Sequence, residues 1–377
     1  MSTTPLRIAL VSDAVLPFHK GGKETRIYHL SKVLVRMGHV VDIYTMKWWD
    51  EGNTYVHEGI TYHAICRLYP LYTADRRRSI REGVMFGISC LKMLRHDFDI
   101  IETDHMPYFP LFFTKMVTVL KRKPLYATWH EVVGLTAWKK YLGPVKGTIA
   151  YIVERTSIIL PDHVIAVSKH TQNQIRDELH YKGKLSLVSN GIDLTRIKAI
   201  PAATETSDII YVGRLVLHKH VDLLIKAVAL LKISSPYIRC VVIGDGPEYI
   251  KLSSLVKEMG LTENVIITGR LESSDDVYAH MKASKIFISP STREGFGITI
   301  LEAFACGLSV VVVNHKDNLA QYLVTSETGI VCDLLAPNIA RAAETLLNRS
   351  PGPSLAVDTD SYDWDQQASA LERAYGL

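Results

Sequence analysis

The sequence has few cysteines and no long apolar run. Its five cysteines are odd in number, widely spaced and without a Cys-x-x-Cys pair, which argues against a disulfide framework and a zinc knuckle. No stretch reaches the roughly 18 uncharged apolar residues of a membrane-spanning helix. The N-terminus also lacks the apolar segment of a signal peptide. We therefore expect a cytoplasmic protein, which can still lie against the inner face of the cytoplasmic membrane.

The charge of the chain is nearly balanced overall but unevenly divided. The 43 lysine and arginine residues against 39 aspartate and glutamate residues give a net charge of +4. Residues 1–200 carry 28 basic and 18 acidic residues, whereas residues 201–377 carry 15 and 21. The basic half predicts contact with something anionic. Nucleic acid is not expected, because the basic residues lack interleaved aromatics that would stack on bases.

The pattern of apolar residues predicts an α/β fold. Short apolar runs alternate with amphipathic stretches, as in βαβ units with parallel sheets. A chain of 377 residues is too long for one ordinary core, and a small, polar, proline-containing segment spans residues 200–208. We expect two doubly wound, Rossmann-like domains, residues 1–200 and 201–360. The strands expected in them are 7–11, 40–45, 60–65, 100–102, 125–128, 164–167, 185–188, 209–212, 240–243, 265–268, 286–289, 309–313 and 329–331.

Adjacent glycines, Gly21 and Gly22, follow the first strand and open the first helix. Such glycines let backbone N–H groups approach an anion at a helix N-terminus. A tight turn without a ligand is the alternative. The pattern is neither Gly-x-Gly-x-x-Gly nor a P-loop, so a dinucleotide dehydrogenase or NTPase is not supported.

A pair of cations follows the first strand of the second half. Arg214 and Lys219 come after Gly213, where an Arg fork and a Lys point charge suit a diphosphate. Two solvated surface cations are the alternative. The glycine cluster 244–246, after the next strand, is expected to be a structural turn.

The segment 289–307 carries the most informative motif. A strand gives way to a glycine-containing loop and then to an apolar helix. The loop amides can hold a phosphate, Glu294 is free to face a sugar, and Glu302 can accept hydrogen bonds from a ribose diol. An ordinary helix-surface carboxylate is the alternative for Glu302.

Two histidines, His105 and His130, each follow a strand of the first half. They predict a polar ligand-facing edge, although no zinc-binding set emerges. Asp97 and Asp99 precede a strand, so we expect them at the opposite edge of the sheet, where they would not hold a metal for the ligand.

These motifs, together with Asn190-Gly191-Ile192-Asp193, resemble those of the family-4 glycosyltransferases of GT-B fold, in the right order along nearly the whole chain. The resemblance implies two domains that face each other across a cleft. A nucleotide-sugar donor would bind the second domain and an acceptor the first. The tail, residues 361–377, would cross back to the first domain.

The resemblance also implies roles for individual residues. The catalytic residues would be Glu294, His130, Arg214 and Lys219. Arg214 and Lys219 would hold the diphosphate, Glu302 the ribose and Glu294 the donor-sugar hydroxyls, with His130 near the reacting carbon. The other donor-binding residues would be Gly21, Gly22, Gly269, Arg270, Leu271, Phe296, Gly297 and Ile298.

The implied reaction is retaining and needs neither a metal nor a cofactor. No positioned nucleophile stands out, which favours a front-face displacement in which the leaving phosphate takes the acceptor's proton. Three positions depart from the family pattern: His220 where glycine is frequent, Ser309 where proline is frequent, and Gln321 where an acid is usual.

The acceptor is expected to be a glycan, a lipid-linked sugar or a lipid. Lys20, Lys23 and His105 are placed on its side. A basic run before an apolar helix, Arg76, Arg77, Arg78 and Arg81, predicts contact with an anionic membrane surface. A core-packed helix with a solvated basic entry is the alternative. A non-catalytic nucleotide-sugar-binding module and a nucleotide-sugar epimerase are the competing functions.

Overall fold

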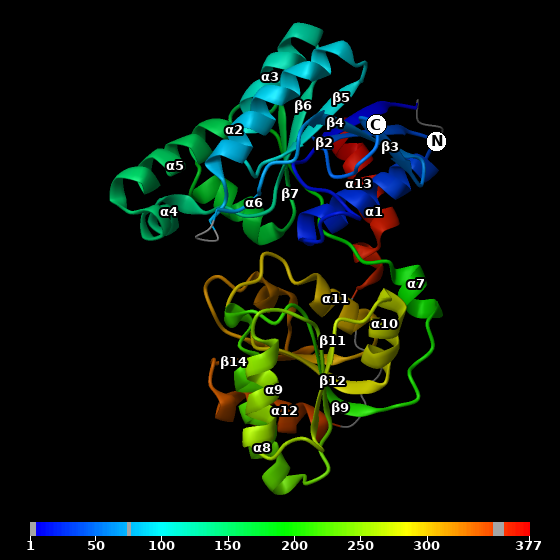
Figure 1. Ribbon diagram of the computed structural model, residues 1–377, viewed down its shortest axis with the longest axis vertical. Coiled ribbons are helices and arrows are strands. Elements are labelled where there is room, and N and C mark those ends of the chain that lie inside the picture. Colours follow the sequence, from blue (N-terminus) through cyan, green and yellow to red (C-terminus); the bar gives the residue numbers. More distant parts are fainter. Residues whose placement is uncertain (1–4, 74–76, 350–357) are drawn as a thin grey trace. The chain divides into compact units, whose positions relative to one another are not determined.

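The computed structural model describes residues 5–73, 77–349 and 358–377, and the chain divides into two units (Figure 1). Unit 1 runs to Gly191 and resumes at Trp364, and unit 2 spans Ile192–Asp363. The division therefore precedes the expected linker, and residues 200–208 belong to unit 2. The C-terminal helix belongs to unit 1.

Unit 1 is built on an eight-stranded sheet with the order β3-β4-β2-β1-β5-β6-β7-β8. All neighbouring strands are parallel except β3 and β4, which pair antiparallel. The strands are β1 (Arg7–Val11), β2 (Val40–Met46), β3 (Thr54–His57), β4 (Ile60–Cys66), β5 (Ile100–Asp104), β6 (Leu125–Trp129), β7 (His163–Ala166) and β8 (Leu185–Leu187).

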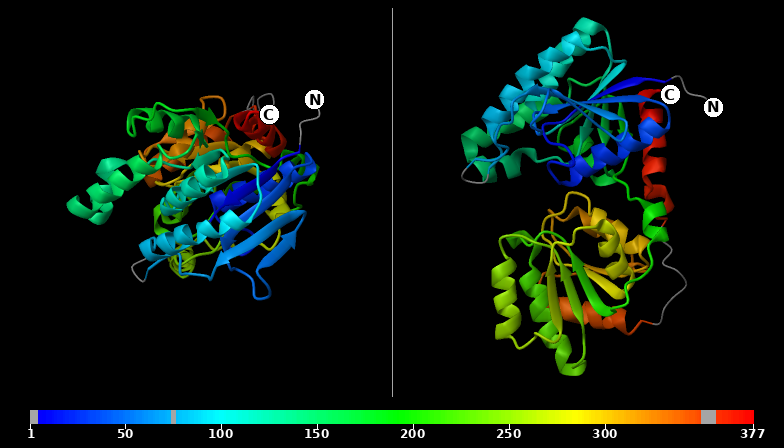
Figure 2. Two further views of the ribbon diagram at one scale, coloured as in Figure 1. Left: turned by 90° about the horizontal axis from the view of Figure 1, so that it is seen from above. Right: turned by 45° about the vertical axis from the view of Figure 1, so that its right-hand side comes forward.

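Helices cover both faces of this sheet. They are α1 (Gly22–Arg36), α2 (Ile80–Ser89), the 3-10 helix η1 (Cys90–Arg95), α3 (Phe109–Lys121), α4 (Gly134–Leu142), α5 (Pro144–Ser157), α6 (Lys169–Asp177) and α13 (Trp364–Tyr375). Side chains alternate along β1, so that Ile8 and Leu10 pack under α1 and α13, while Ala9 and Val11 pack under α2, η1 and α3. Figure 2 shows α13 lying along unit 1 beside α1.

Unit 2 is a six-stranded parallel sheet with the order β11-β10-β9-β12-β13-β14. Its strands are β9 (Ser207–Val212), β10 (Cys240–Ile243), β11 (Val265–Gly269), β12 (Ser284–Ser289), β13 (Ser309–Val313) and β14 (Gly329–Cys332). Its helices are α7 (Leu194–Ala199), η2 (Leu217–Lys219), α8 (Val221–Ser234), α9 (Tyr249–Glu258), α10 (Ser274–Lys282), α11 (Ile298–Ala305), η3 (Leu319–Leu323), α12 (Ala336–Leu347) and η4 (Asp360–Tyr362). Ile209 packs in the core with α8 and α12, and Ile210 in the core with α10 and α11.

The α/β fold with two doubly wound domains is confirmed, and every expected strand is present. The prediction missed β3. This strand lies at the edge of its sheet, and its residues alternate between exposed and half-buried, so it carries no continuous apolar run.

Candidate active site

The strand order of unit 2 reverses between β9 and β12, which are neighbours in the sheet. Ligands of open α/β sheets bind beyond the carboxyl ends of the strands at such a point. The loops that follow these two strands are joined there, because the Thr292 amide donates to the His218 carbonyl at 2.9 Å. His220 Nε2 also lies 3.1 Å from Thr292 Oγ1. The two loops expected to bind the nucleotide-sugar are therefore held together by hydrogen bonds.

Lys219 and Glu294 meet at this point, each from one of the two loops. The ammonium of Lys219 donates to Glu294 Oε1, and both side chains are more than four-fifths buried. The backbone of Glu294 is fixed by hydrogen bonds to Asp317 at 3.0 Å and Leu319 at 2.8 Å. The two residues predicted from the sequence thus form a largely buried ion pair. This ion pair must separate before either side chain can bind a ligand.

The neighbouring groups can bind an anion. Arg214 is exposed, and the described residues give its guanidinium no ion-pair partner. Helix α11 begins after Gly297, and no side chain caps its first amides. Gly297 has a φ of +97°, and a Cβ there would lie 2.6 Å from that of Ala320, so glycine is required. Phe296 is buried in the core, which leaves only its backbone for a ligand.

Glu302 is held by a tyrosine of the preceding helix. The Tyr278 hydroxyl of α10 donates to Glu302 Oε1 at 2.9 Å. Tyr278 is almost fully buried, and burial, followed by the negative charge of Glu302, raises the pKa of its phenol. The phenol therefore stays a donor and orients the carboxylate.

The glycine cluster 244–246 is structural, as expected. A Cβ on Gly244 would lie 1.8 Å from the Gly213 carbonyl oxygen, and one on Gly246 would lie 2.3 Å from that of Leu215. The Leu215 amide donates to the Asp245 carbonyl at 2.9 Å. The cluster thus packs backbone to backbone against the loop that carries Arg214. At the end of β11, the Gly269 carbonyl accepts from Gly244 at 2.9 Å.

The strand order of unit 1 reverses between β1 and β5, and polar side chains follow both strands. Asp104, at the end of β5, accepts from Ser12 Oγ at 2.9 Å and lies 2.9 Å from His130 Nε2. Burial alone would raise the pKa of Asp104, but Lys23 and His130 lower it below its usual range. Asp104 therefore remains ionised and orients the His130 ring.

A second carboxylate at this edge, Asp13, is fully buried between two cations. Lys23 and Arg78 both donate to it, and their charges outweigh burial and lower its pKa. Glu82 of α2 lies beside them, with its Oε2 3.5 Å from the Arg78 guanidinium. Burial, and then the negative charge of Asp13, raises the pKa of Glu82 to about 8. This buried charge cluster consists of Asp13, Lys23, Arg78, Glu82 and Asp104.

Two family models match successive parts of the chain. The model "Glycosyl transferases group 1" matches residues 195–356, and the model "Glycosyltransferase Family 4" matches residues 20–196. Together they cover most of both units. The chain belongs to the family-4 glycosyltransferases.

Named relatives and a solved structure agree with this assignment. The chain is 26% identical over 366 aligned residues to the phosphatidylinositol N-acetylglucosaminyltransferase gpi3 subunit of Schizosaccharomyces pombe, covering 89% of this chain and 69% of that protein. It is 27% identical to a GDP-mannose-dependent alpha-(1-6)-phosphatidylinositol monomannoside mannosyltransferase of Mycobacterium tuberculosis, over 56% of this chain and 60% of that one. HepE of Anabaena, solved with UDP and glucose, superposes with a TM-score of 0.71 at 16% identity, covering 98% of this chain and 99% of that one, which shows the shared GT-B fold.

In this glycosyltransferase, His105 is buried beneath His130. Its ring stacks on Trp129 at a centroid distance of 5.0 Å, and its Nδ1 lies 3.4 Å from the His130 amide. Burial lowers the pKa of His105 to about 3, so the ring is neutral. The position favours support of His130 over direct contact with an acceptor. Lys23 is likewise engaged in the buried charge cluster, whereas Lys20 is exposed.

The fold of unit 1 does not itself require a glycine at position 22. A Cβ on Gly22 would meet nothing within 4 Å, and one on Gly21 would meet only the far end of the Glu24 side chain, at 2.3 Å. Neither residue has a positive φ. Backbone strain therefore does not account for this pair, and the approach of a ligand to it stays a prediction.

The basic run predicted to touch a membrane is divided in the structure. Arg78 points into the buried charge cluster, and Arg77 lies over the ring of Tyr141, 5.5 Å from its centroid. Arg81 is exposed, and Arg76 lies outside the described residues. Within the described part of the chain, no helix is long and apolar enough to cross a membrane.

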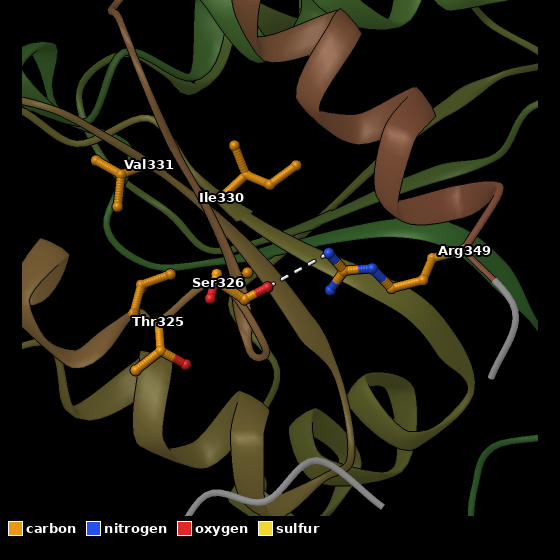
Figure 3. Close-up of a pocket in the computed structure, with 7 residues that line it drawn as sticks. Thr325, Ser326, Ile330, Val331 and Arg349 are labelled. Carbon is orange, nitrogen blue, oxygen red and sulfur yellow. Dashed lines mark hydrogen bonds between the residues drawn. The ribbon is translucent and has the colours of Figure 1, made fainter. Parts of the chain in front are cut away.

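A hollow of about 340 Å³ lies at one edge of unit 2 (Figure 3). Thr325, Ser326, Ile330 and Val331 line it, on the edge strand β14 and the turn before it. Arg349 reaches into it and donates to the Ser326 carbonyl at 3.3 Å. None of the predicted donor or acceptor residues lines this hollow.

Sequence reasoning missed four residues that hold the site: Asp13, Glu82, Asp104 and Tyr278. Asp13 and Asp104 could have been found, because each lies where a strand of unit 1 ends. Glu82 and Tyr278 had no such signal, since each lies within a helix. Among the residues described, no cluster of three or more His, Cys, Asp or Glu side chains could hold a metal ion.

Proposed function

We propose that this glycosyltransferase moves a sugar, with retention of anomeric configuration, from a nucleotide-diphosphate sugar to a hydroxyl group of a lipid-anchored acceptor. Unit 2 binds the donor and unit 1 the acceptor. One observation carries the proposal. Lys219, Arg214 and Glu294 lie in the two joined loops at the switch point of unit 2, beside the uncapped start of α11.

Donor binding breaks the ion pair between Lys219 and Glu294. A diphosphate oxygen takes the place of Glu294 at the Lys219 ammonium, and Glu294 is released to the hydroxyls of the donor sugar. Arg214 and the amides of α11 complete the phosphate site. Glu302, oriented by the hydrogen bond from the Tyr278 hydroxyl, binds the ribose hydroxyls. The UDP in the HepE structure supports a nucleotide donor for this fold.

The arrangement of carboxylates supports a front-face displacement. Glu302, bound to Tyr278, serves the ribose, and Glu294, once donor binding releases it from Lys219, serves the hydroxyls of the donor sugar. Neither carboxylate is therefore assigned to attack the reacting carbon. The acceptor oxygen forms the new bond as the bond to the phosphate oxygen breaks, and that phosphate takes the acceptor's proton. Arg214, Lys219 and the α11 amides stabilise the leaving diphosphate, so that no metal is needed.

The names of the relatives support a lipid-anchored acceptor. The yeast relative is named for phosphatidylinositol. The mycobacterial relative is named for phosphatidylinositol monomannoside. The excess of basic residues in the first half of the chain suits an anionic headgroup. We therefore propose an acceptor that contains a phosphate and stays anchored in the bilayer.

A thermal-shift screen of nucleotide sugars tests the donor site, because a ligand that binds the folded form raises its melting temperature. One donor class should raise the Tm of the wild type, and Lys219→Ala should lose that shift. Lys226→Ala, a half-exposed lysine of α8 paired with Asp222, is the matched control. A shift that survives in Lys219→Ala would contradict the assignment.

Two further measurements test the finer points of the reaction. Proton NMR of the product should show the anomeric configuration of the donor, and an inverted product would overturn the front-face step. Activity should persist in excess EDTA, and its loss would overturn metal independence. Donor binding without any transfer would instead favour a nucleotide-sugar-binding module, and isomerised donor would favour an epimerase.

A further inference from the structure

Helices α4 and α5 form a close-packed hairpin on unit 1. They are joined at Gly143, and a Cβ on Gly147 of α5 would lie 2.5 Å from the Trp138 carbonyl oxygen of α4. The two backbones therefore touch. Both views in Figure 2, like Figure 1, show the hairpin projecting from the side of unit 1.

The outer face of α5 is apolar and exposed. Val145, Ile149 and Ile152 are 71%, 57% and 53% exposed, and their spacing of four and three residues places them on one helix face. Tyr141 of α4 is also exposed. Single exposed apolar residues are ordinary, but a row of them on a projecting element marks an interaction surface.

The exposed charges of this hairpin have one sign. Lys139, Lys140 and Lys146 are exposed, and the sequence has no acidic residue from 132 to 153. The next carboxylate, Glu154, faces inward and accepts four hydrogen bonds. Arg77 extends the basic surface, because its guanidinium lies over the Tyr141 ring. The hairpin thus carries both exposed apolar side chains and exposed cations.

We propose that the α4–α5 hairpin docks on an anionic lipid bilayer. The apolar row of α5 enters the boundary between headgroups and acyl chains, while the lysines extend to anionic headgroups. The membrane contact thus centres on this hairpin with Arg77 beside it, and does not include Arg78, which is withdrawn into the buried charge cluster. The inference deepens the proposed function, because it names the surface on which a bilayer-anchored acceptor is reached.

Vesicle flotation tests this docking without donor or acceptor. Wild type should float with phosphatidylcholine vesicles that contain phosphatidylglycerol, and not with phosphatidylcholine alone. The triple variant Val145→Glu/Ile149→Glu/Ile152→Glu should lose binding at least about tenfold, because each change places a charge in the interface. Replacing the three lysines by glutamine should weaken binding roughly fivefold per lysine.

The control variant is Ile233→Glu/Ile250→Glu, whose side chains in unit 2 are similarly exposed. It should float like the wild type. Three outcomes would overturn the inference: a wild type that does not float, a triple variant that floats normally, or an equal loss in the control. The donor-induced thermal shift should be unchanged in the triple variant. Flotation without transfer would refute the proposed function and leave the docking surface standing.

Discussion

Glu82 makes the stability of unit 1 depend on pH. Its carboxyl group is 1% exposed and lies beside Asp13 and Arg78. With Glu82 protonated, the buried charge cluster holds two cations, Lys23 and Arg78, and two carboxylates, Asp13 and Asp104. Ionisation of Glu82 would add an unbalanced negative charge inside the protein.

The sign and size of the effect follow from the two pKa values. The pKa of Glu82 is raised from 4.5 to about 8 on folding, so the folded state holds this proton more tightly. The stabilisation is complete below pH 4.5 and is lost as the pH rises through about 8. The difference between the two pKa values corresponds to at most about 5 kcal/mol of unfolding free energy.

Urea unfolding of wild type and Glu82→Gln, between about pH 5 and about pH 9, measures this effect. At the acidic end of this range, the variant and the wild type should have similar unfolding free energies. At the alkaline end, the variant should be more stable than the wild type by several kcal/mol, up to about 5 kcal/mol. Glu51→Gln, an exposed position of the same unit, should follow the wild type. Parallel pH curves for wild type and Glu82→Gln would refute the reasoning.

Three other changes have defined outcomes. His220→Ala should cost about 1 kcal/mol more than His220→Gly in urea unfolding, because residue 220 has a φ of +48° that glycine adopts without strain; equal values would contradict this. Glu154→Gln should destabilise the protein by about 3 kcal/mol or more, since the carboxylate accepts from four donors at 2.8–3.1 Å and an amide nitrogen cannot accept; a change near zero would contradict it. Tyr278→Phe should reduce the preference of the protein for ribose over 2′-deoxyribose nucleotides by roughly two- to tenfold in calorimetry, because Glu302 loses its orienting donor; an unchanged ratio would show that Tyr278 does not position it.

Much of the fold could be predicted because the buried parallel strands are continuous apolar runs. Ser309–Val313, for example, is serine followed by four valines in a strand paired on both sides, with β12 and β14. The loops that follow such strands lie at one edge, which is why Arg214, Lys219 and Glu294 could be placed near one another before any geometry was known.

The buried charge cluster could not be predicted in the same way. Its members come from the loop after β1, from α1, from the loop before α2, from α2 itself and from β5, and only the folded chain brings them together. Arg78, within a run of three arginines, has the pattern of a surface residue, although its partner Asp13 is buried. The local sequence does not show which arginine of such a run directs its side chain into the protein.

The departure at His220 illustrates a different limit. Glycine is frequent there because the backbone is left-handed, with φ of +48° and ψ of 39°. His220 keeps this geometry, and its side chain lies 3.1 Å from Thr292 Oγ1. The loop beside the predicted phosphate site therefore tolerates the substitution, which the sequence alone could not show.

The central claim, that unit 2 presents a nucleotide-sugar to an acceptor lipid, is tested most directly by transfer of labelled sugar into lipid. Nucleotide-diphosphate sugars labelled in the sugar are incubated with phosphatidylinositol-containing vesicles and the enzyme, and the lipid is then extracted. The wild type should transfer label from one donor class into the lipid. The Lys219→Ala variant, shown to be folded by circular dichroism, should transfer it at a rate at least about a hundredfold lower. Label that stays in water for every donor, or a Lys219→Ala rate equal to that of wild type, would contradict the account.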